Sequence, residues 1–573
     1  MRFYRFLLSL LLVAILAGGD LLSQTGRQIN SADEQQFRVE VRASANQLLR
    51  QEGYTPDHGS NATVTYVIGG RELIELLRRS GYQPSVEPID GVEVATVTLQ
   101  EVQSRLSADN CFVPLDAYPS YALYESLLEG FADNYPEIAR IHELGVLASG
   151  RRILALEITD QPDEEEAEPK VLLTSSMHGD ELGGFHVSLR LISELVCNYG
   201  NDVELTNLIN TTEIWINPLA NPDGTYRDDN TIISEPTRGN ANFIDLNRNF
   251  PDPDNGDHPD GNAYQPETEI FMQFAEDYAF DLSLNIHGGA EVFNYPWDTY
   301  AQRTADDNWW KHIARQYADS CQHTAGHNGY MDALNNGITN GYDWYPIYGG
   351  RQDYTTYFHH GREATLEISN IKTTPPEQFE FIWNANRRPL INFIKQAGYG
   401  LRGVVRDSLT AAPLGASVFI DGHDEYNSDV YSKMPTGRYH RYLKAGIYNV
   451  LFSAEGYHPK LVACFVGDDE PTFKDVNLLP IQSSNSTLAD SELITAFYQS
   501  GSLYLDHLPE DHHNWHLELL SVDGRRITTS GIPGGRRRFN LRVGYLAPGA
   551  YICRVHENGK QRVLRFSSVV RKK

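Results

Sequence analysis

Residues 171–181 read VLLTSSMHGDE, an aliphatic run that ends in small, polar and charged residues. Val171 to Ser175 have the length and composition of a buried strand, and Gly184 to Tyr199 have the periodicity of a helix. Alternating buried strands and helices are typical of a mainly parallel sheet, whose functional side chains gather at the strand ends. The stretch therefore predicts an α/β fold with polar groups directly after a central strand.

The same pattern extends from Tyr118 to about Ala397. A helix is predicted first, at Tyr121 to Asn134. Further strands are predicted at Ile141 to Leu147, at Arg152 to Ile158, up to Asn217, up to Asn285 and at Ala364 to Ile368. We expect an α/β fold in which a mainly parallel mixed sheet carries helices on both faces.

His178 and Glu181 directly follow the Val171 to Ser175 strand, so both side chains can turn toward one cation. His287 follows another apolar strand, 287 − 178 = 109 residues later. Two imidazoles and one carboxylate suit zinc, which in catalytic sites keeps a fourth position for water. The sequence therefore predicts one Zn²⁺ held by His178, Glu181 and His287, although these ligands also accept other divalent ions.

The composition limits the possible partners. The chain has 573 residues, 41% of them hydrophobic, with a formal net charge of −28. An acidic surface cannot neutralise a run of phosphates, so we expect no nucleic-acid partner, whereas positively charged peptides are compatible. No segment after the N-terminus has the roughly 20 apolar residues of a spanning helix, so no stable membrane span is expected.

The N-terminus has the features of a signal peptide. Basic residues precede an apolar run from Phe6 to Ala17, and two glycines follow it. We expect residues 1–23 to be removed and the protein to be secreted or held at the cell surface, with an uncleaved N-terminal anchor as the alternative. The five cysteines are scattered, which excludes a thiolate zinc site and permits one or two disulfides with at least one thiol left over.

Composition changes divide the rest of the chain. A small α/β region is expected at 24–110, with strands at Phe37 to Ala43 and Thr63 to Ile68, and the main α/β domain at 111–397. Short strands and turns predict a β-sandwich at 398–480. Residues 481–490 are expected to form a linker, and 491–573 a last β unit with a basic end.

Several ordered motifs between about 118 and 397 resemble the M14 family of zinc metallocarboxypeptidases, and within it the carboxypeptidase N/E subfamily. The family's metal motif matches His178, Glu181 and His287. The other matching motifs are Asn221 to Gly224, Asp245 to Phe250, Asn336 to Gly341 and Thr365 to Glu367. The resemblance implies a zinc carboxypeptidase fold and hydrolysis of C-terminal peptide bonds.

The resemblance also implies the roles of the reacting groups. Glu367 corresponds to the catalytic glutamate, which takes a proton from water and passes it to the leaving amine. Arg238 corresponds to the arginine that stabilises the oxyanion. Asn247 and Arg248 would bind the free carboxylate of the substrate, because a guanidinium fits a carboxylate bidentately. Tyr345 would close over the bound chain end.

Three further residues complete the implied site. Asp245 would orient a ligand imidazole from outside the metal's own ligand set. Asp298 and Gln352 resemble the residues that, in this subfamily, line the pocket for a basic C-terminal side chain. A carboxylate in a partly desolvated pocket favours Lys or Arg over an apolar side chain. We therefore expect release of C-terminal Lys or Arg.

The flanking regions carry weaker resemblances. Residues 398–480 resemble the transthyretin-like domain that follows the catalytic unit in this subfamily. Residues 491–573 resemble a type IX secretion sorting domain, which would make the secretion machinery a partner. The N-terminal region 24–110 is interpreted as a prodomain that inhibits, and a structural appendage without a regulatory role is the alternative.

Two other functions fit the sequence. Diaminopimelate also presents an amine beside a carboxylate, so a carboxypeptidase that acts on cell-wall stem peptides is one alternative. A non-catalytic binding protein on the same fold is the other, although every position needed for chemistry is present. Digestion of muropeptides and assays with a chelator separate these readings.

Overall fold

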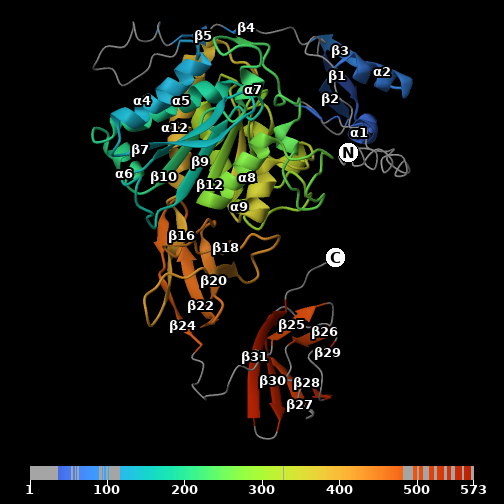
Figure 1. Cartoon of the computed structure of the whole chain (residues 1–573), viewed down its shortest axis with the longest axis vertical. Coiled ribbons are helices and arrows are strands. Elements are labelled where there is room, and N and C mark those ends of the chain that lie inside the picture. Colours follow the sequence, from blue (N-terminus) through green and yellow to red (C-terminus); the bar gives the residue numbers. More distant parts are fainter. Residues whose placement is uncertain are drawn as a thin grey trace, which may run out of the picture. The chain divides into compact units, whose positions relative to one another are not determined.

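The computed structural model describes residues 37–101 with gaps at 53, 55, 58–59, 61–62, 89–92, 95 and 99–100, residues 116–481 except 327, and residues 495–568 with gaps at 500–501, 507–514, 522–524, 534–538, 544–548 and 558–559. The chain divides into two units, Met1–Ile481 and Gln482–Lys573, which we describe separately (Figure 1). The expected signal peptide, nearly all of the expected linker, Cys111 and the basic tail lie outside the described residues.

An eight-stranded mixed sheet forms the centre of the first unit, in the order β14-β13-β15-β12-β9-β10-β8-β7 (Figure 1). Its strands are β7 Ala139–Val146, β8 Arg152–Ile158, β9 Lys170–Ser175, β10 Glu213–Asn217, β12 Leu282–His287, β13 Ala290–Tyr295, β14 Ile338–Asn340 and β15 Arg362–Ser369. The four central strands β15, β12, β9 and β10 are parallel to one another, and β13, β8 and β7 are added in antiparallel pairs. The predicted fold class is confirmed.

Helices cover both faces of this sheet because successive residues of each strand point to opposite sides. Leu173 and Ile216 face one core, to which α4 (Tyr121–Asn134), α5 (Gly183–Asn198), α9 (Asp307–Thr324) and α12 (Phe379–Gln396) contribute. Leu172 and Trp215 face the other core, which Phe271 of α8 (Pro266–Tyr278) closes. The parallel strands are buried on both sides, so their carboxyl ends are fixed by packing in two directions.

The N-terminal region has a small sheet and core of its own. Three strands pair in the order β2-β1-β3, namely β1 Phe37–Arg42, β2 Val64–Gly69 and β3 Ser85–Pro88. Helices α1 (Asn46–Gln51) and α2 (Arg71–Arg79) accompany them. Val39, Leu49, Val67 and Leu73 pack together as a separate hydrophobic cluster. The expected strands at 37–43 and 63–68 therefore exist, with ends that differ by one residue.

After α12 the first unit continues as short strands in two sheets, ordered β19-β16-β24-β21 with β23 beside β16, and β18-β17-β20-β22. Their bounds are β16 Gly400–Asp407, β17 Ser417–Ile420, β18 Val430–Tyr431, β19 Arg438–Arg441, β20 Gly446–Ser453, β21 Tyr457–His458, β22 Lys460–Val466, β23 Pro471–Phe473 and β24 Val476–Pro480. Alternating residues such as Val418, Val450 and Val466 form a core between them. This is the arrangement of a small β-sandwich.

The second unit is also built from strands. Its two sheets have the orders β25-β26-β29 and β28-β27-β30-β31. The strands are β25 Thr495–Gln499, β26 Ser502–Asp506, β27 Trp515–Ser521, β28 Arg526–Ile532, β29 Phe539–Arg542, β30 Gly549–Glu557 and β31 Lys560–Ser568. Leu503, Leu517 and Val555 lie in its core.

Four of the cysteines lie in the described part of the chain. Cys197 is disulfide-bonded, whereas Cys321, Cys464 and Cys553 are buried free thiols. Within the described part of the chain, none of the helices combines the length and the apolar character needed to cross a membrane.

Candidate active site

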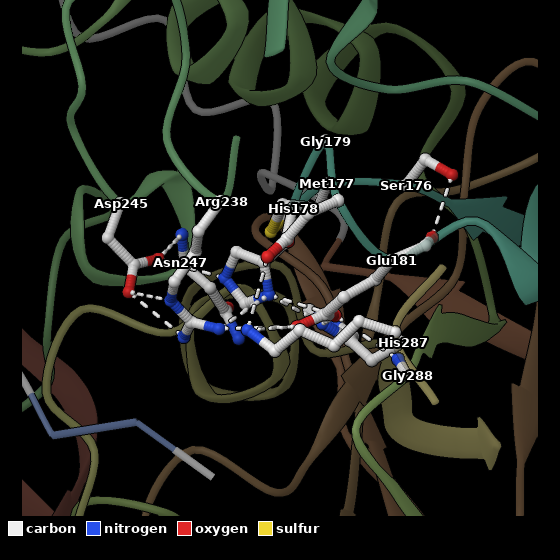
Figure 2. A network of polar contacts seen from close by, with 12 residues as sticks. Ser176, Met177, His178, Gly179, Glu181, Arg238, Asp245, Asn247, His287 and Gly288 are labelled. Atoms are coloured by element: carbon white, nitrogen blue, oxygen red, sulfur yellow. Dashed lines mark hydrogen bonds and ion pairs between the residues drawn. The ribbon is translucent and has the colours of Figure 1, made fainter. Parts of the chain in front are cut away.

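The three predicted metal ligands meet at the carboxyl ends of neighbouring strands. His178 and Glu181 lie in the turn between β9 and α5, and His287 is the last residue of β12, which pairs with β9. The Nδ1 atoms of His178 and His287 are 3.1 Å apart, and Glu181 Oε2 lies 3.0 Å from the first and 2.8 Å from the second. All three side chains are buried and point toward one another (Figure 2).

These donors fit a zinc ion. Two imidazole nitrogens and one carboxylate oxygen form the ligand set of catalytic zinc sites, and donors only 2.8–3.1 Å apart converge on one point. The two ring nitrogens both face the same carboxylate oxygen of Glu181, so one cation could accept a lone pair from each of the three atoms. His178, Glu181 and His287 are therefore the residues that would hold the metal.

Neighbouring groups fix the orientation of the ligands. Asp245 Oδ1 lies 3.0 Å from His178 Nε2, Asn285 Nδ2 lies 2.7 Å from His287 Nε2, and the Gly288 amide donates to Glu181 Oε2 over 3.2 Å. Burial opposes ionisation of Asp245, but the adjacent Arg238 and other cations outweigh it and hold its pKa well below the usual value. Such contacts on the far side of a ligand set its tautomer and direction.

A glycine makes the turn after β9 possible. A Cβ atom at Gly179 would lie 2.3 Å from the backbone carbonyl carbon of Gly224, so no larger residue fits without moving the chain. The Asn221 side chain holds the facing loop by accepting from the Gly224 amide at 2.8 Å and by donating to Met177 O at 3.1 Å. The spacing of His178 and Glu181 is therefore set by close backbone packing.

Glu367 lies beside the ligands because β15 pairs with β12, in register with His287. Its side chain is buried and lines the same cavity as both histidines. Burial and then the nearby Glu181 raise its pKa well above the ordinary value, against the opposing charges of Arg238 and Lys372. A carboxyl with a raised pKa beside a metal site is suited to proton transfer.

Two arginines and a lysine make this end of the cavity positive. Arg238 lies between Asp245 at 3.0 Å and Glu181 Oε1 at 3.2 Å (Figure 2). Arg248 donates to Asn247 O over 2.8 Å. Lys372, which the sequence analysis does not identify, lies 3.6 Å from Glu181 Oε1. These cations can bind carboxylate or oxyanion groups near the metal ligands.

Asp298 adds an acidic group to the lining of the same cavity. Gln352 and Asn294 donate to Asp298 Oδ1 over 3.1 and 3.4 Å, and the backbone amide of Asp298 donates to Asp353. Burial raises the pKa of Asp298 to about 7. A Cβ at Gly341 would lie 1.7 Å from Asp298 Oδ1, so the carboxylate reaches its place only because that residue is glycine.

Arg351, next to Gln352, does not neutralise this pocket. Its side chain is buried and turns away, with Nε donating to Glu363 over 2.9 Å and an NH2 group donating to Thr174 Oγ1 over 2.6 Å. Glu363 therefore balances the guanidinium charge, and Asp298 remains an acidic group that faces the cavity.

One cavity collects most of the residues predicted from the sequence. His178, Arg238, Asn247, Arg248, His287, Asp298, Tyr345 and Glu367 line it, together with Asn294, Trp344, Ile347 and Thr365. Glu181, Asp245 and Gln352 contact its lining side chains directly. Lys372 and Asp57 were missed because the ion pair between them joins positions 315 residues apart, outside any local motif.

The sequence is similar to those of known carboxypeptidases. The model of the family described as zinc carboxypeptidase matches residues 124–388. Carboxypeptidase M of Mus musculus is 34% identical over 366 residues, 61% of this chain and 80% of that protein. The carboxypeptidase N catalytic chain of Rattus norvegicus is 35% identical over 384 residues, 60% of this chain and 82% of that protein. The chain belongs to the zinc carboxypeptidase family.

Other relatives are longer than this chain. Carboxypeptidase D of Homo sapiens is 37% identical over 350 residues, which are 58% of this chain, and the chain spans only 25% of that protein. Among solved structures, carboxypeptidase A of Helicoverpa armigera matches with 18% identity and a TM-score of 0.49 over 64% of this chain and 98% of that one.

Proposed function

We propose that the protein is a metal-dependent carboxypeptidase that hydrolyses the C-terminal peptide bond of peptides and proteins. The observation that carries this proposal is the convergence of His178, Glu181 and His287 beside a cavity that Glu367 also lines. Family membership supports the same reaction. When bound, zinc polarises the scissile carbonyl and acidifies a water molecule.

Glu367 is proposed to move the proton. The oxygen of water bonds to the carbonyl carbon, Glu367 takes a water proton, and the C–N bond breaks as that proton passes to the amine. Arg238 is proposed to stabilise the negative charge on the carbonyl oxygen through its guanidinium. Its pairing with Asp245 at 3.0 Å holds that group in place.

The restriction of cleavage to the last peptide bond is assigned to Asn247, Arg248 and Tyr345. All three line the cavity, and a guanidinium beside an amide is suited to grip a terminal carboxylate. Burial raises the pKa of Tyr345 above its ordinary value, so its hydroxyl stays protonated and can donate to the substrate. An internal peptide has no carboxylate for Arg248, so only the last bond would be cleaved.

Preference for Lys or Arg is assigned to Asp298 and Gln352. Asp298 lines the cavity, and Gln352 orients it over 3.1 Å. Because Glu363 balances the charge of Arg351, the Asp298 carboxylate is left to attract a cationic side chain. The substrates would be peptides and proteins with basic C-termini.

The remaining regions are proposed to serve folding and export. Residues 1–23 would direct secretion, 398–480 would act as a transthyretin-like support of the catalytic part, and 491–573 would address the protein to a secretion machinery. The β-sandwich arrangement of residues 400–480 supports the second assignment.

One experiment tests the central proposal. The full chain is incubated with peptides that end in Arg, Lys, Phe or Glu, with and without a chelator, and released amino acids are measured. Chelator-sensitive release of the last residue, fastest for Arg and Lys, is expected. Release that the chelator does not affect, or no release from any peptide, overturns the proposal. Digestion of muropeptides in parallel shows whether the protein acts on cell-wall stem peptides.

A further inference from the structure

A second cavity lies where the α/β part of the first unit meets the β-sandwich. The α/β part contributes Asp281, His360 and Arg362 to its lining, and the β-sandwich contributes Lys433, His440 and Tyr442. This cavity shares no lining residue with the cavity of the candidate active site. Its volume of about 30 Å³ exceeds the roughly 10–15 Å³ that one water molecule needs, so a larger guest can enter.

Two cations beside this cavity share one buried carboxylate. Asp281 is 5% exposed, and its carboxylate pairs with Lys433 at 2.6 Å and with Arg438. The Arg438 side chain is also buried, and Glu165 lies 3.9 Å from its Nε. Asp281 therefore compensates two positive charges at close range, and a further anion beside Lys433 would be attracted.

Lys433 keeps a hydrogen-bond donor for such a guest. An ammonium group has three N–H bonds, and Lys433 Nζ donates to Ala279 O and to Asp281 Oδ1. One N–H is therefore left for the cavity that this side chain lines. Burial lowers the pKa of Lys433 to about 8 against the opposing charge of Asp281, so an added anion would stabilise the charged form.

His440 is a buried side chain whose polar atoms are unpaired. It is 4% exposed, and neither ring nitrogen has a hydrogen-bond partner among the described residues. Its Nδ1 lies 3.6 Å from Asp281 Oδ2, which is too far for a hydrogen bond. Burial holds the pKa of His440 well below the usual value, so the neutral ring offers one N–H donor. Since buried polar groups are normally paired, an unpaired imidazole that lines a cavity is suited to bind a guest there.

His360 lines the cavity from the α/β part. Its Nδ1 donates to Asp429 O over 2.8 Å and to Asn427 O over 3.0 Å, because carbonyl oxygens only accept. Nε2 is thus the ring nitrogen left to meet a guest. The side chains of His360 and Lys433 are 22% and 18% exposed, so the cavity can be reached from solvent.

We propose that this junction binds a small inorganic oxyanion such as phosphate, which accepts hydrogen bonds from Lys433 and His440 of the β-sandwich and pairs with His360 of the α/β part. A hydrogen phosphate ion has oxygens that accept and a hydroxyl that donates, so it can pair with His360 Nε2 whether or not that atom is protonated. Asp281 is the acid of the lining, and Lys433 and Arg438 compensate its charge. The ion would link the two parts of the first unit.

The test is calorimetric titration of sodium phosphate, at neutral pH, into the full-length wild type and into His440→Leu. This variant removes the ring donor and breaks no hydrogen bond of the described residues, so it should fold. We expect phosphate to bind this site at least about tenfold more weakly in His440→Leu, the usual effect of losing one hydrogen bond to a charged group. Phosphate bound in the active-site cavity would contribute equally to both titrations and leaves the comparison unaffected.

A second measurement follows thermal unfolding of the first unit within the full chain. Phosphate should raise the melting temperature of wild type more than that of His440→Leu, because a ligand that binds only the folded state stabilises it. Sulfate, another oxyanion, should act as phosphate does, whereas chloride at the same ionic strength should have a smaller effect. An equal effect of chloride overturns the assignment to an oxyanion.

Lys433→Met should also weaken phosphate binding by at least about tenfold. Its matched control is Lys444→Met, since Lys444 belongs to the same β-sandwich, is 34% exposed and pairs with Asp468. Equal phosphate affinities of wild type and His440→Leu, or an equal loss in Lys444→Met, overturn the site. If Lys433→Met does not fold, His440→Leu decides alone. None of these measurements uses turnover, so their outcome does not depend on the proposed peptidase function.

Discussion

At the scale of single residues, the proposed roles separate metal binding from proton transfer. Glu367 belongs to β15, whereas the three ligands belong to β12 and to the turn after β9. Glu367→Gln keeps the size of the side chain and removes the base. We expect kcat to fall by roughly 10²–10⁴-fold, the usual contribution of general acid–base catalysis. Zinc content, measured on the purified protein, should stay at the wild-type level; residual activity within threefold of wild type would contradict the assignment.

Asp298 gives a prediction about pH. Because burial raises its pKa to about 7, the carboxyl is neutral below that pH and charged above it. A neutral carboxyl attracts a cationic side chain weakly, so the ratio of kcat/KM for Arg-ending over Phe-ending peptides should rise as pH increases through about 7. Asp298→Asn should flatten this ratio and lower it by at least tenfold, since the ion pair is lost. A ratio that is independent of pH in wild type would show that another group sets the preference.

At the scale of elements, the strands were the most predictable part. β8 and α4 have the predicted bounds, and β9 begins one residue earlier than predicted. The aliphatic runs of β8 and β9 have strand length because both faces of these strands are buried. α12 was not predicted, since Pro389 in its interior favours a break. Packing of α12 against α9 and α5 overrides that local preference.

The candidate site was predictable for a related reason. The candidate ligands lie at or just after strand ends, and the candidate base lies within β15, each in a short motif that local sequence can identify. Lys372 and Asp57 occur in no such motif, and only the tertiary structure brings them to Arg238. Long-range contacts of this kind depend on how the N-terminal region docks, which no periodicity in the sequence encodes.

The turn after β9 gives a prediction at this scale. Gly179→Ala places a Cβ 2.3 Å from the Gly224 carbonyl carbon, so the backbone must shift and separate His178 from Glu181. We expect zinc affinity to fall by at least tenfold, while the far-ultraviolet circular dichroism stays unchanged. Gly130→Ala in α4 is the control, because nothing lies within 4 Å of its Cβ position and alanine favours a helix. Equal zinc affinities of the two variants would contradict a packing role for Gly179.

At the scale of the first unit, buried ion pairs join the α/β part to the β-sandwich that follows it. Asp306 of the α/β part contacts Arg362 at 2.8 Å and Arg441 of β19 at 2.8 Å, and Arg441 also pairs with Asp424. Asp306 and Arg441 are almost completely inaccessible. Charges buried in this way tolerate the loss of a partner poorly, so the two parts are expected to unfold together.

Asp306→Asn tests this coupling, because it leaves Arg362 and Arg441 short of one negative charge. We expect the free energy of unfolding to fall by about 3–5 kcal/mol. Burial opposes ionisation of Asp306, but the two arginines outweigh it and lower its pKa, so its contribution is complete above the unfolded pKa and is lost as pH falls toward the folded one. The difference in the free energy of unfolding between wild type and variant should therefore shrink in acid.

Asp163→Asn is the control. It breaks an ion pair whose acid is 77% exposed and should lower the free energy of unfolding by less than about 1 kcal/mol. Calorimetry on the full chain should show one transition for residues 37–481 that Asp306→Asn moves as a whole, and two separate transitions would contradict the coupling.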